Sequence, residues 1–174
     1  MSEPTLNDRF HLIGIGGAGM SVVAELLRSR GAIVEGSDRE DSAVLEHLRA
    51  VGVRVYVGHD ASHVDPTAVV VVSTAIRESN PELAIARERG QRVIHRSQAL
   101  ALAASGMRFV GVAGAHGKTS TSGMLAIALA ACGLDPSVAV GGVLPQLGTG
   151  AHLGAGDVFV AEADESDGSF LNYS

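Results

Sequence analysis

Two glycine-rich segments in the 174-residue chain have residue types and spacing that suit phosphate binding. Gly14, Gly16 and Gly19 fit the pattern G-x-G-x-x-G, in which backbone N–H groups approach a diphosphate without interference from Cβ atoms. About a hundred residues later, Gly117 is followed by Lys118 and Thr119. Two phosphate sites in one chain indicate an enzyme with two phosphorylated substrates.

The first glycine motif is followed by an acidic residue at the spacing expected for nucleotide binding. Asp38 ends an apolar segment downstream of Gly19, where its carboxylate could accept hydrogen bonds from ribose hydroxyls. By itself this pattern indicates a dinucleotide or a nucleoside diphosphate, with NAD(P) as the usual ligand. The alternative is that the glycines only permit a tight turn and close helix packing.

Three further polar residues lie where predicted parallel strands end. His59 follows the third predicted strand, and Ser73 and Thr74 follow the fourth. Ligands of open α/β sheets bind at these carboxyl ends, so these residues are candidate contacts, although each could equally belong to a surface loop.

The second glycine motif predicts a phosphate loop, residues 114–120. The Lys118 ammonium would reach the β- and γ-phosphates, and the Thr119 hydroxyl would coordinate Mg²⁺. Val112 stands where the longer form of the motif has its first glycine. His116 could contact a phosphoryl oxygen or only line the loop. The candidate nucleotide-binding residues are Gly114, Ala115, His116, Gly117, Lys118, Thr119 and Ser120.

An acidic segment follows the apolar residues 158–161 near the end of the sequence. Glu162 is the first acid, and Asp164, Glu165 and Asp167 come after it. If this strand runs parallel to the strand that leads into the phosphate loop, Glu162 would complete the shell of a magnesium ion. The alternative is a solvated acidic turn.

Apolar periodicity places these motifs on alternating strands and helices, which predicts an α/β fold. Strands are expected at 10–15, 32–38, 53–56, 68–72, 92–95, 108–113, 138–140 and 158–161, and helices at 20–30, 42–50, 81–89, 97–104 and 118–132. Ser42 is expected to cap the second helix, and Pro81 to occupy the first turn of the third. The pattern therefore predicts a Rossmann-like domain with a parallel sheet for residues 1–105. For residues 106–174 it predicts the truncated start of a phosphate-loop ATPase domain.

Composition excludes several classes of function. The net charge is −6 and no basic run occurs, so no nucleic-acid partner is expected. The first residues do not resemble a signal peptide and no apolar run reaches membrane-spanning length, which predicts a cytoplasmic protein without membrane contact. Cys132 is the only cysteine, which excludes an intrachain disulfide. Its apolar surroundings predict a buried thiol.

Taken together, these motifs resemble those of the ATP-dependent Mur ligases of peptidoglycan synthesis. The resemblance extends over essentially the whole chain and rests on residues 11–20, 36–38, 70–76, 80–82, 111–119 and 162–171. It implies that the first domain binds the UDP of UDP-N-acetylmuramate in place of NAD(P). The implied contacts are Gly16, Gly17, Ala18, Gly19, Met20, Asp38, His59, Ser73, Thr74 and Ala75.

The resemblance also implies the chemistry of the second domain. Lys118 would bind the phosphates of ATP and act in catalysis with Glu162, while Thr119 and Glu162 would hold Mg²⁺. The second substrate would be L-alanine. Ala115 and Thr74 depart from the family pattern, in which threonine and serine are usual, and loss of the hydroxyl at position 115 would tune the loop without abolishing phosphate binding.

Length is the larger departure, because family members continue through the rest of the ATPase domain and a third domain. We therefore expect this chain to recognise the UDP-sugar but not to ligate. Three alternatives stay open: a related ligase that attaches a recycled peptide to the same UDP-sugar, an NAD(P)-dependent oxidoreductase, and a stand-alone UDP-sugar-binding module.

Overall fold

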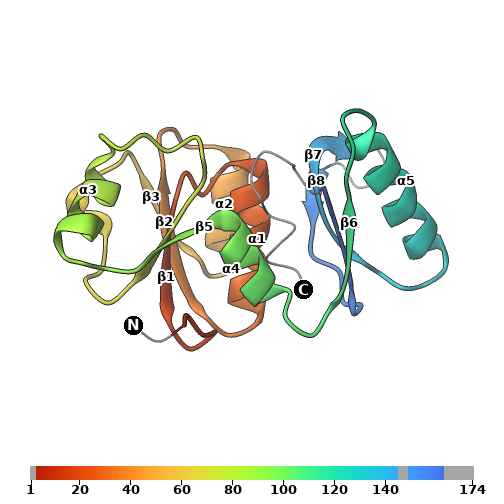
Figure 1. The fold of residues 1–174 in the computed structure, drawn as a ribbon, viewed down its shortest axis with the longest axis horizontal. Coiled ribbons are helices and arrows are strands. Elements are labelled where there is room, and N and C mark those ends of the chain that lie inside the picture. Colours follow the sequence, from red (N-terminus) through yellow and green to blue (C-terminus); the bar gives the residue numbers. More distant parts are fainter. Residues whose placement is uncertain (1–2, 145–148, 163–174) are drawn as a thin grey trace. The chain divides into compact units, whose positions relative to one another are not determined.

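A computed structural model describes residues 3–144 and 149–162. The chain divides into two compact units, Met1–Ala103 and Ala104–Ser174, each of which has its own sheet (Figure 1).

The first unit is built on a five-stranded sheet in the order β3-β2-β1-β4-β5. Every pair of neighbouring strands in it is parallel, so the carboxyl ends of all the strands lie along one edge. Because β2 and β4 flank β1 on opposite sides, the strand order reverses at the end of β1, which is where such sheets bind ligands. The strands are β1 (Arg9–Ile13), β2 (Ile33–Asp38), β3 (Arg54–Val57), β4 (Val69–Val72) and β5 (Val93–His95).

Helices cover both faces of this sheet, as the α/β prediction requires (Figure 1). One face carries α1 (Ala18–Ser29), α2 (Ala43–Ala50) and α4 (Arg96–Ala103), and the other carries α3 (Pro81–Glu88) and the short 3₁₀ helix η1 (Ala61–His63). The predicted helix starts are confirmed: the Ser42 side chain caps α2, and Pro81 opens α3 behind the Asn80 cap.

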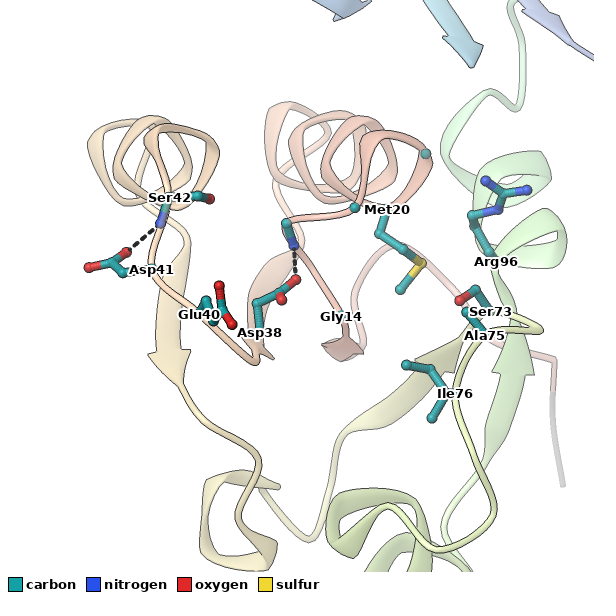
Figure 2. A pocket seen from close by; sticks show the side chains of 13 residues that line it. Gly14, Met20, Asp38, Glu40, Asp41, Ser42, Ser73, Ala75, Ile76 and Arg96 are labelled. Carbon is teal, nitrogen blue, oxygen red and sulfur yellow. Dashed lines mark hydrogen bonds between the residues drawn. The ribbon is translucent and has the colours of Figure 1, made fainter. Parts of the chain in front are cut away.

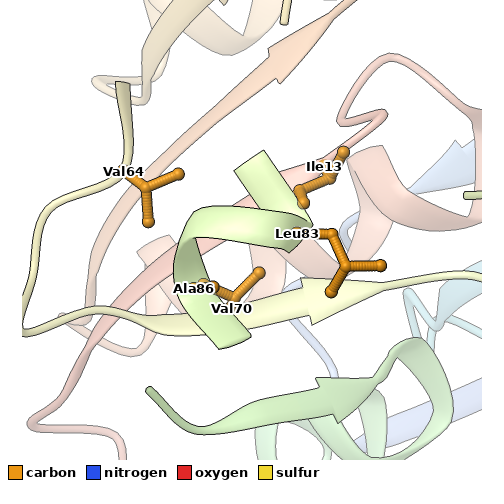
Figure 3. Close-up of a cluster of buried hydrophobic side chains, with 5 residues drawn as sticks. All are labelled: Ile13, Val64, Val70, Leu83 and Ala86. Carbon is orange, nitrogen blue, oxygen red and sulfur yellow. The ribbon is translucent and has the colours of Figure 1, made fainter. Parts of the chain in front are cut away.

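The core beneath α3 fixes that helix on the sheet. It contains Ile13 of β1, Val70 of β4, Leu83 and Ala86 of α3, and Val64 after η1 (Figure 3). All are buried, and Leu83 is only 2% exposed. Its neighbour Glu82, the second residue of α3, is thereby held over the sheet as well.

A charged cluster crosses the same core. His11 on β1 lies between two carboxylates, with Nδ1 3.7 Å from Glu35 Oε1 and Nε2 3.4 Å from Glu82 Oε2. Burial by itself would lower the pKa of His11, but Glu35 and Glu82 outweigh it and raise this pKa above its ordinary value of 6.5. Burial would likewise raise the pKa of Glu82, but His11 and the Ser37 hydroxyl hold it below its ordinary value of 4.5. When it is protonated, His11 therefore offsets the buried negative charge of the two carboxylates.

The second unit has a four-stranded sheet in the order β6-β9-β7-β8. β9 is parallel to both β6 and β7, whereas β8 pairs with β7 in the antiparallel sense. Its elements are β6 (Arg108–Val112), α5 (Lys118–Ala131), β7 (Ser137–Leu144), β8 (Thr149–His152) and β9 (Val158–Glu162). β8 was not predicted, because Thr149-Gly150-Ala151-His152 lacks the apolar alternation that signals a strand.

The prediction of a buried thiol at Cys132 is wrong. Cys132 is exposed, because it is the C-cap of α5 and lies beyond the last turn that packs on the sheet. α5 has 14 residues and is the longest of the described helices, none of which is long and apolar enough to cross a membrane.

Replacing Leu83 by alanine should destabilise the first unit by about 2–5 kcal/mol, because the change leaves a cavity between α3 and the sheet. A urea titration of the amide NMR signals of β1 and β4 would report on this unit alone. Val44→Ala, at an exposed position of α2, is the control and should shift stability by no more than about 0.5 kcal/mol. Equal effects of the two substitutions would contradict the assigned core.

The His11 cluster predicts how stability depends on pH. A raised folded-state pKa gives stabilisation that is complete below pH 6.5 and is lost as pH rises through the folded-state value. The free energy of unfolding of the first unit should therefore decrease from neutral to mildly basic pH, and less steeply in His11→Gln. Urea titrations of both proteins at several pH values test this, and identical pH slopes would show that His11 carries no charge in the folded state.

Candidate functional site

A pocket of about 560 Å³ opens at the carboxyl ends of the strands in the first unit. The glycine loop between β1 and α1 forms its floor, and the residues after β2, β4 and β5 form its sides (Figure 2). The lining consists of Gly14, Gly16, Gly17, Gly19, Met20, Asp38, Glu40, Asp41, Ser42, Ser73, Ala75, Ile76 and Arg96.

Hydrogen bonds to the end of β2 hold the glycine loop in place. The N–H groups of Gly14 and Ile15 both donate to the Ser37 carbonyl oxygen, at 2.8 and 2.9 Å. The Gly16 N–H donates to Asp38 Oδ2 at 2.7 Å (Figure 2). A Cβ at Gly16 would lie only 2.9 Å from that oxygen, so glycine permits this close approach. The loop conformation therefore depends on β2.

Arg96 is a pocket residue that the sequence reasoning did not identify. It is the first residue of α4 and faces the pocket from the side opposite Asp38 (Figure 2). A Cβ at Gly19 would lie 2.0 Å from Arg96 Nη1, so the third glycine of the motif makes room for the guanidinium. Its position directly after the predicted strand 92–95 was the signal that could have found it. The pocket thus has a cation at one end and the carboxylates of Asp38, Glu40 and Asp41 at the other.

The helices that follow the two glycine motifs begin differently from their neighbours. α1 starts after Gly17 and α5 after Gly117, and neither N-terminus has a side-chain cap. α2 and α3 are capped by Ser42 and Asn80. Uncapped helix N-termini present N–H groups and the positive end of the helix dipole, which together suit an anion.

The structure brings most of the predicted UDP-sugar contacts together in this pocket. Those in its lining are Gly16, Gly17, Gly19, Met20, Asp38, Ser73 and Ala75. Thr74 lies between two lining residues but is exposed and outside the lining. Ala18 begins α1, and its side chain lies outside the described part of the structure.

His59 is not in the pocket lining either. Its Nδ1 lies 2.9 Å from Ser37 Oγ and 3.4 Å from Glu82 Oε2, so the ring is engaged by groups at the end of β2 and the start of α3.

In the second unit, the phosphate-loop motif connects the end of β6 to the start of α5. Gly117 has a φ of +77°, a left-handed conformation that glycine adopts without strain. Lys118 Nζ donates to the Gly114 carbonyl oxygen at 2.7 Å, which folds the ammonium back over the loop. Ala115, His116 and Ser120 are exposed, whereas Lys118 and Thr119 are partly buried in the first turn of α5.

Glu162 ends the strand beside the one that feeds this loop. β9 and β6 are parallel, and Glu162 pairs with Val112, the last residue of β6. The structure therefore meets the condition on which the assignment of Glu162 depended, a strand parallel to the one before the loop. Asp164, Glu165 and Asp167 lie outside the described residues. Within the described ranges, no group of three or more His, Cys, Asp or Glu side chains is arranged to hold a metal ion.

Comparison with known proteins identifies the family. The model of the Mur ligase family, catalytic domain, matches residues 9–108. The UDP-N-acetylmuramate–L-alanine ligase of Renibacterium salmoninarum is 57% identical over 170 residues, which cover 97% of this chain and 37% of that protein. The ligase of the same name from Streptomyces avermitilis is 56% identical over 172 residues, with 98% and 37% covered. The chain thus spans just over a third of the length of these curated relatives.

Solved structures of Mur ligases are also similar to this chain. UDP-N-acetylmuramate-alanine ligase MurC from Thermotoga maritima superimposes with a TM-score of 0.79 at 33% identity, covering 91% of this chain and 37% of that one. A UDP-N-acetylmuramate:L-alanyl-γ-D-glutamyl-meso-diaminopimelate ligase from Neisseria meningitides gives a TM-score of 0.82 at 31% identity, covering 95% and 57%. From the family match over more than half of its residues, the chain belongs to the Mur ligase family.

Proposed function

We propose that this chain supplies the UDP-sugar-binding domain and the first part of the ATP-binding domain of a cytoplasmic UDP-N-acetylmuramate–L-alanine ligase of peptidoglycan synthesis. The observation that carries the proposal is the glycine-loop pocket of the first unit, in a chain whose relatives of that name share 53–57% of its residues. The reaction would be ATP-dependent amide bond formation, in which the muramate carboxylate is phosphorylated and then captured by the amine of L-alanine.

The pocket has donors and acceptors of the kinds that UDP would need. The N-terminus of α1 and the Arg96 guanidinium would bind the diphosphate, and the guanidinium can do so in a bidentate way. Asp38 would accept hydrogen bonds from the ribose hydroxyls. Its oxygens already accept from the N–H groups of Gly16 and Arg39, but each carboxylate oxygen has a second lone pair available. Ser73, Ala75 and Met20 would complete the contacts.

The second unit has groups that fit ATP and Mg²⁺. The N-terminus of α5 and the loop 114–117 offer backbone N–H groups, and Lys118 places an ammonium beside them. Thr119 and Glu162 supply the oxygen ligands that magnesium prefers. Two protein ligands are enough, because Mg²⁺ usually keeps several waters and also binds substrate phosphates. ATP would supply the phosphoryl group that activates the carboxylate, and Lys118 would stabilise the negative charge on that group.

A second candidate is a ligase that attaches a peptide to the same UDP-sugar, since the Neisseria protein of that activity superimposes with a TM-score of 0.82. Both candidates require the first unit to bind the same UDP-sugar. They differ in the amine that is joined to this sugar. The higher identity to the L-alanine ligases favours the first candidate. An oxidoreductase would use the first pocket but would leave Lys118 and Thr119 without a role.

Titration of UDP-N-acetylmuramate into the chain by calorimetry tests the pocket. Asp38→Ala and Arg96→Ala should each weaken binding about tenfold to a hundredfold, as expected for a lost charged hydrogen bond. Arg77→Ala, which removes an exposed arginine outside the lining, should leave the affinity unchanged. Preferential binding of NADH over UDP-N-acetylmuramate would overturn the assignment.

The chain should not ligate, because it spans only about 37% of the length of its curated relatives. We expect no L-alanine-dependent release of inorganic phosphate from ATP in the presence of UDP-N-acetylmuramate, measured in a steady-state coupled assay. A full-length relative serves as the positive control. Turnover by the 174-residue chain would show that the remaining part of those relatives is dispensable.

A further inference from the structure

Glu82 lies outside the pocket lining, yet its carboxylate connects several elements at the ligand-binding edge of the sheet. Its side chain is completely buried. Oε2 accepts a hydrogen bond from Ser37 Oγ on β2 and lies 3.4 Å from both His11 Nε2 on β1 and His59 Nδ1. Oε1 accepts from the Asp60 N–H at 3.3 Å and lies 3.3 Å from His63 Nδ1.

Ser37 joins this buried carboxylate to the glycine loop. Its hydroxyl donates to Glu82, and its carbonyl oxygen accepts from the N–H groups of Gly14 and Ile15. The next residue, Asp38, accepts from the Gly16 N–H. The backbone of the loop is therefore bonded to two consecutive residues of β2, and the first of these is bonded to Glu82.

The direction of the hydrogen bonds determines which ring nitrogen of His59 acts as a donor. Because the Ser37 hydroxyl has a single proton and donates it to Glu82, it can only accept from His59 Nδ1, 2.9 Å away. His59 then carries its proton on Nδ1 and bonds toward the interior, which agrees with its absence from the pocket lining.

We propose that Glu82 is a positioning residue: through Ser37 it fixes the end of β2, and thereby holds the glycine loop in the conformation that binds the diphosphate of the UDP-sugar. This rests on the function proposed above. Arrangement of the loop before binding avoids the cost of ordering it when the ligand arrives. The hydrophobic cluster under α3 supports the arrangement, because Leu83, the neighbour of Glu82, is anchored in it (Figure 3).

Two substitutions distinguish a positioning role of Glu82 from a general effect on stability. Each of them removes a partner of a different carboxylate oxygen of Glu82. Ser37→Ala removes the hydroxyl that links Glu82 to β2, whereas His63→Gln removes a partner of the other carboxylate oxygen. Both changes are smaller than removal of Glu82 itself, which would take away one of the two carboxylates beside buried His11 and could prevent folding.

The first readout needs no ligand. Amide hydrogen exchange of Gly14, Ile15 and Gly16 in the whole chain should be about three- to tenfold faster in Ser37→Ala, as expected for the loss of one hydrogen bond. Exchange at Val34 and Val71, inside β2 and β4, should change much less, and His63→Gln should leave the loop amides within about twofold of the wild type. Unchanged loop exchange in Ser37→Ala, or equal acceleration throughout both strands, would overturn the proposal.

The second readout is the affinity for UDP-N-acetylmuramate by calorimetry. Ser37→Ala should weaken it about three- to tenfold, and His63→Gln should not. Faster loop exchange with unchanged affinity would show that the link does not serve the ligand. If the wild-type chain itself does not bind, the proposed function fails, and the exchange data alone then decide whether Glu82 positions the loop.

Discussion

The glycine loop of the first unit depends on one carbonyl group, that of Ser37. It accepts from both Gly14 and Ile15, and this double contact joins the end of β1 to the end of β2 where the pairing of Ile13 with Ser37 stops. A backbone oxygen has two lone pairs and can satisfy two donors that would otherwise be unpaired at the start of a turn. The floor of the pocket is thus an extension of the sheet, and its shape follows from the parallel register of β1 and β2.

Both units place a glycine loop between a parallel strand and an uncapped helix, but they stabilise that loop differently. In the first unit the loop is tied to the neighbouring strand through Ser37 and Asp38. In the second, Lys118 on the loop's own helix donates to Gly114 within the loop. A ligand phosphate can compete for the Lys118 ammonium, whereas the Ser37 carbonyl serves only the backbone. The conformation of the first loop therefore depends on a neighbouring strand, and that of the second on its own helix.

Burying charges in the first unit costs free energy, and neighbouring opposite charges offset this cost. Glu35 and Glu82 are almost fully excluded from solvent, and His11 lies between them. Replacing His11 would remove a cation from beside both buried carboxylates, which typically costs more than a lost surface ion pair. Apolar residues at these positions could be as stable, so we attribute a structural part to the buried charge of Glu82, which sets the geometry of Ser37 and His59.

The sequence by itself determined the alternation of strands and helices, the two glycine motifs and the position of Glu162 after a strand. These are local properties, since periodicity and caps such as Ser42 and Asn80 act over a few residues. The tertiary structure decided which distant residues meet. Arg96 reaches the pocket because α4 packs beside α1, with room made at Gly19, and His59 turns inward because Glu82 and Ser37 meet it there. Cys132 is exposed because it lies beyond the part of α5 that packs on the sheet. Such contacts join elements far apart in the chain, and a side chain's own type does not reveal which partner the packing will bring to it.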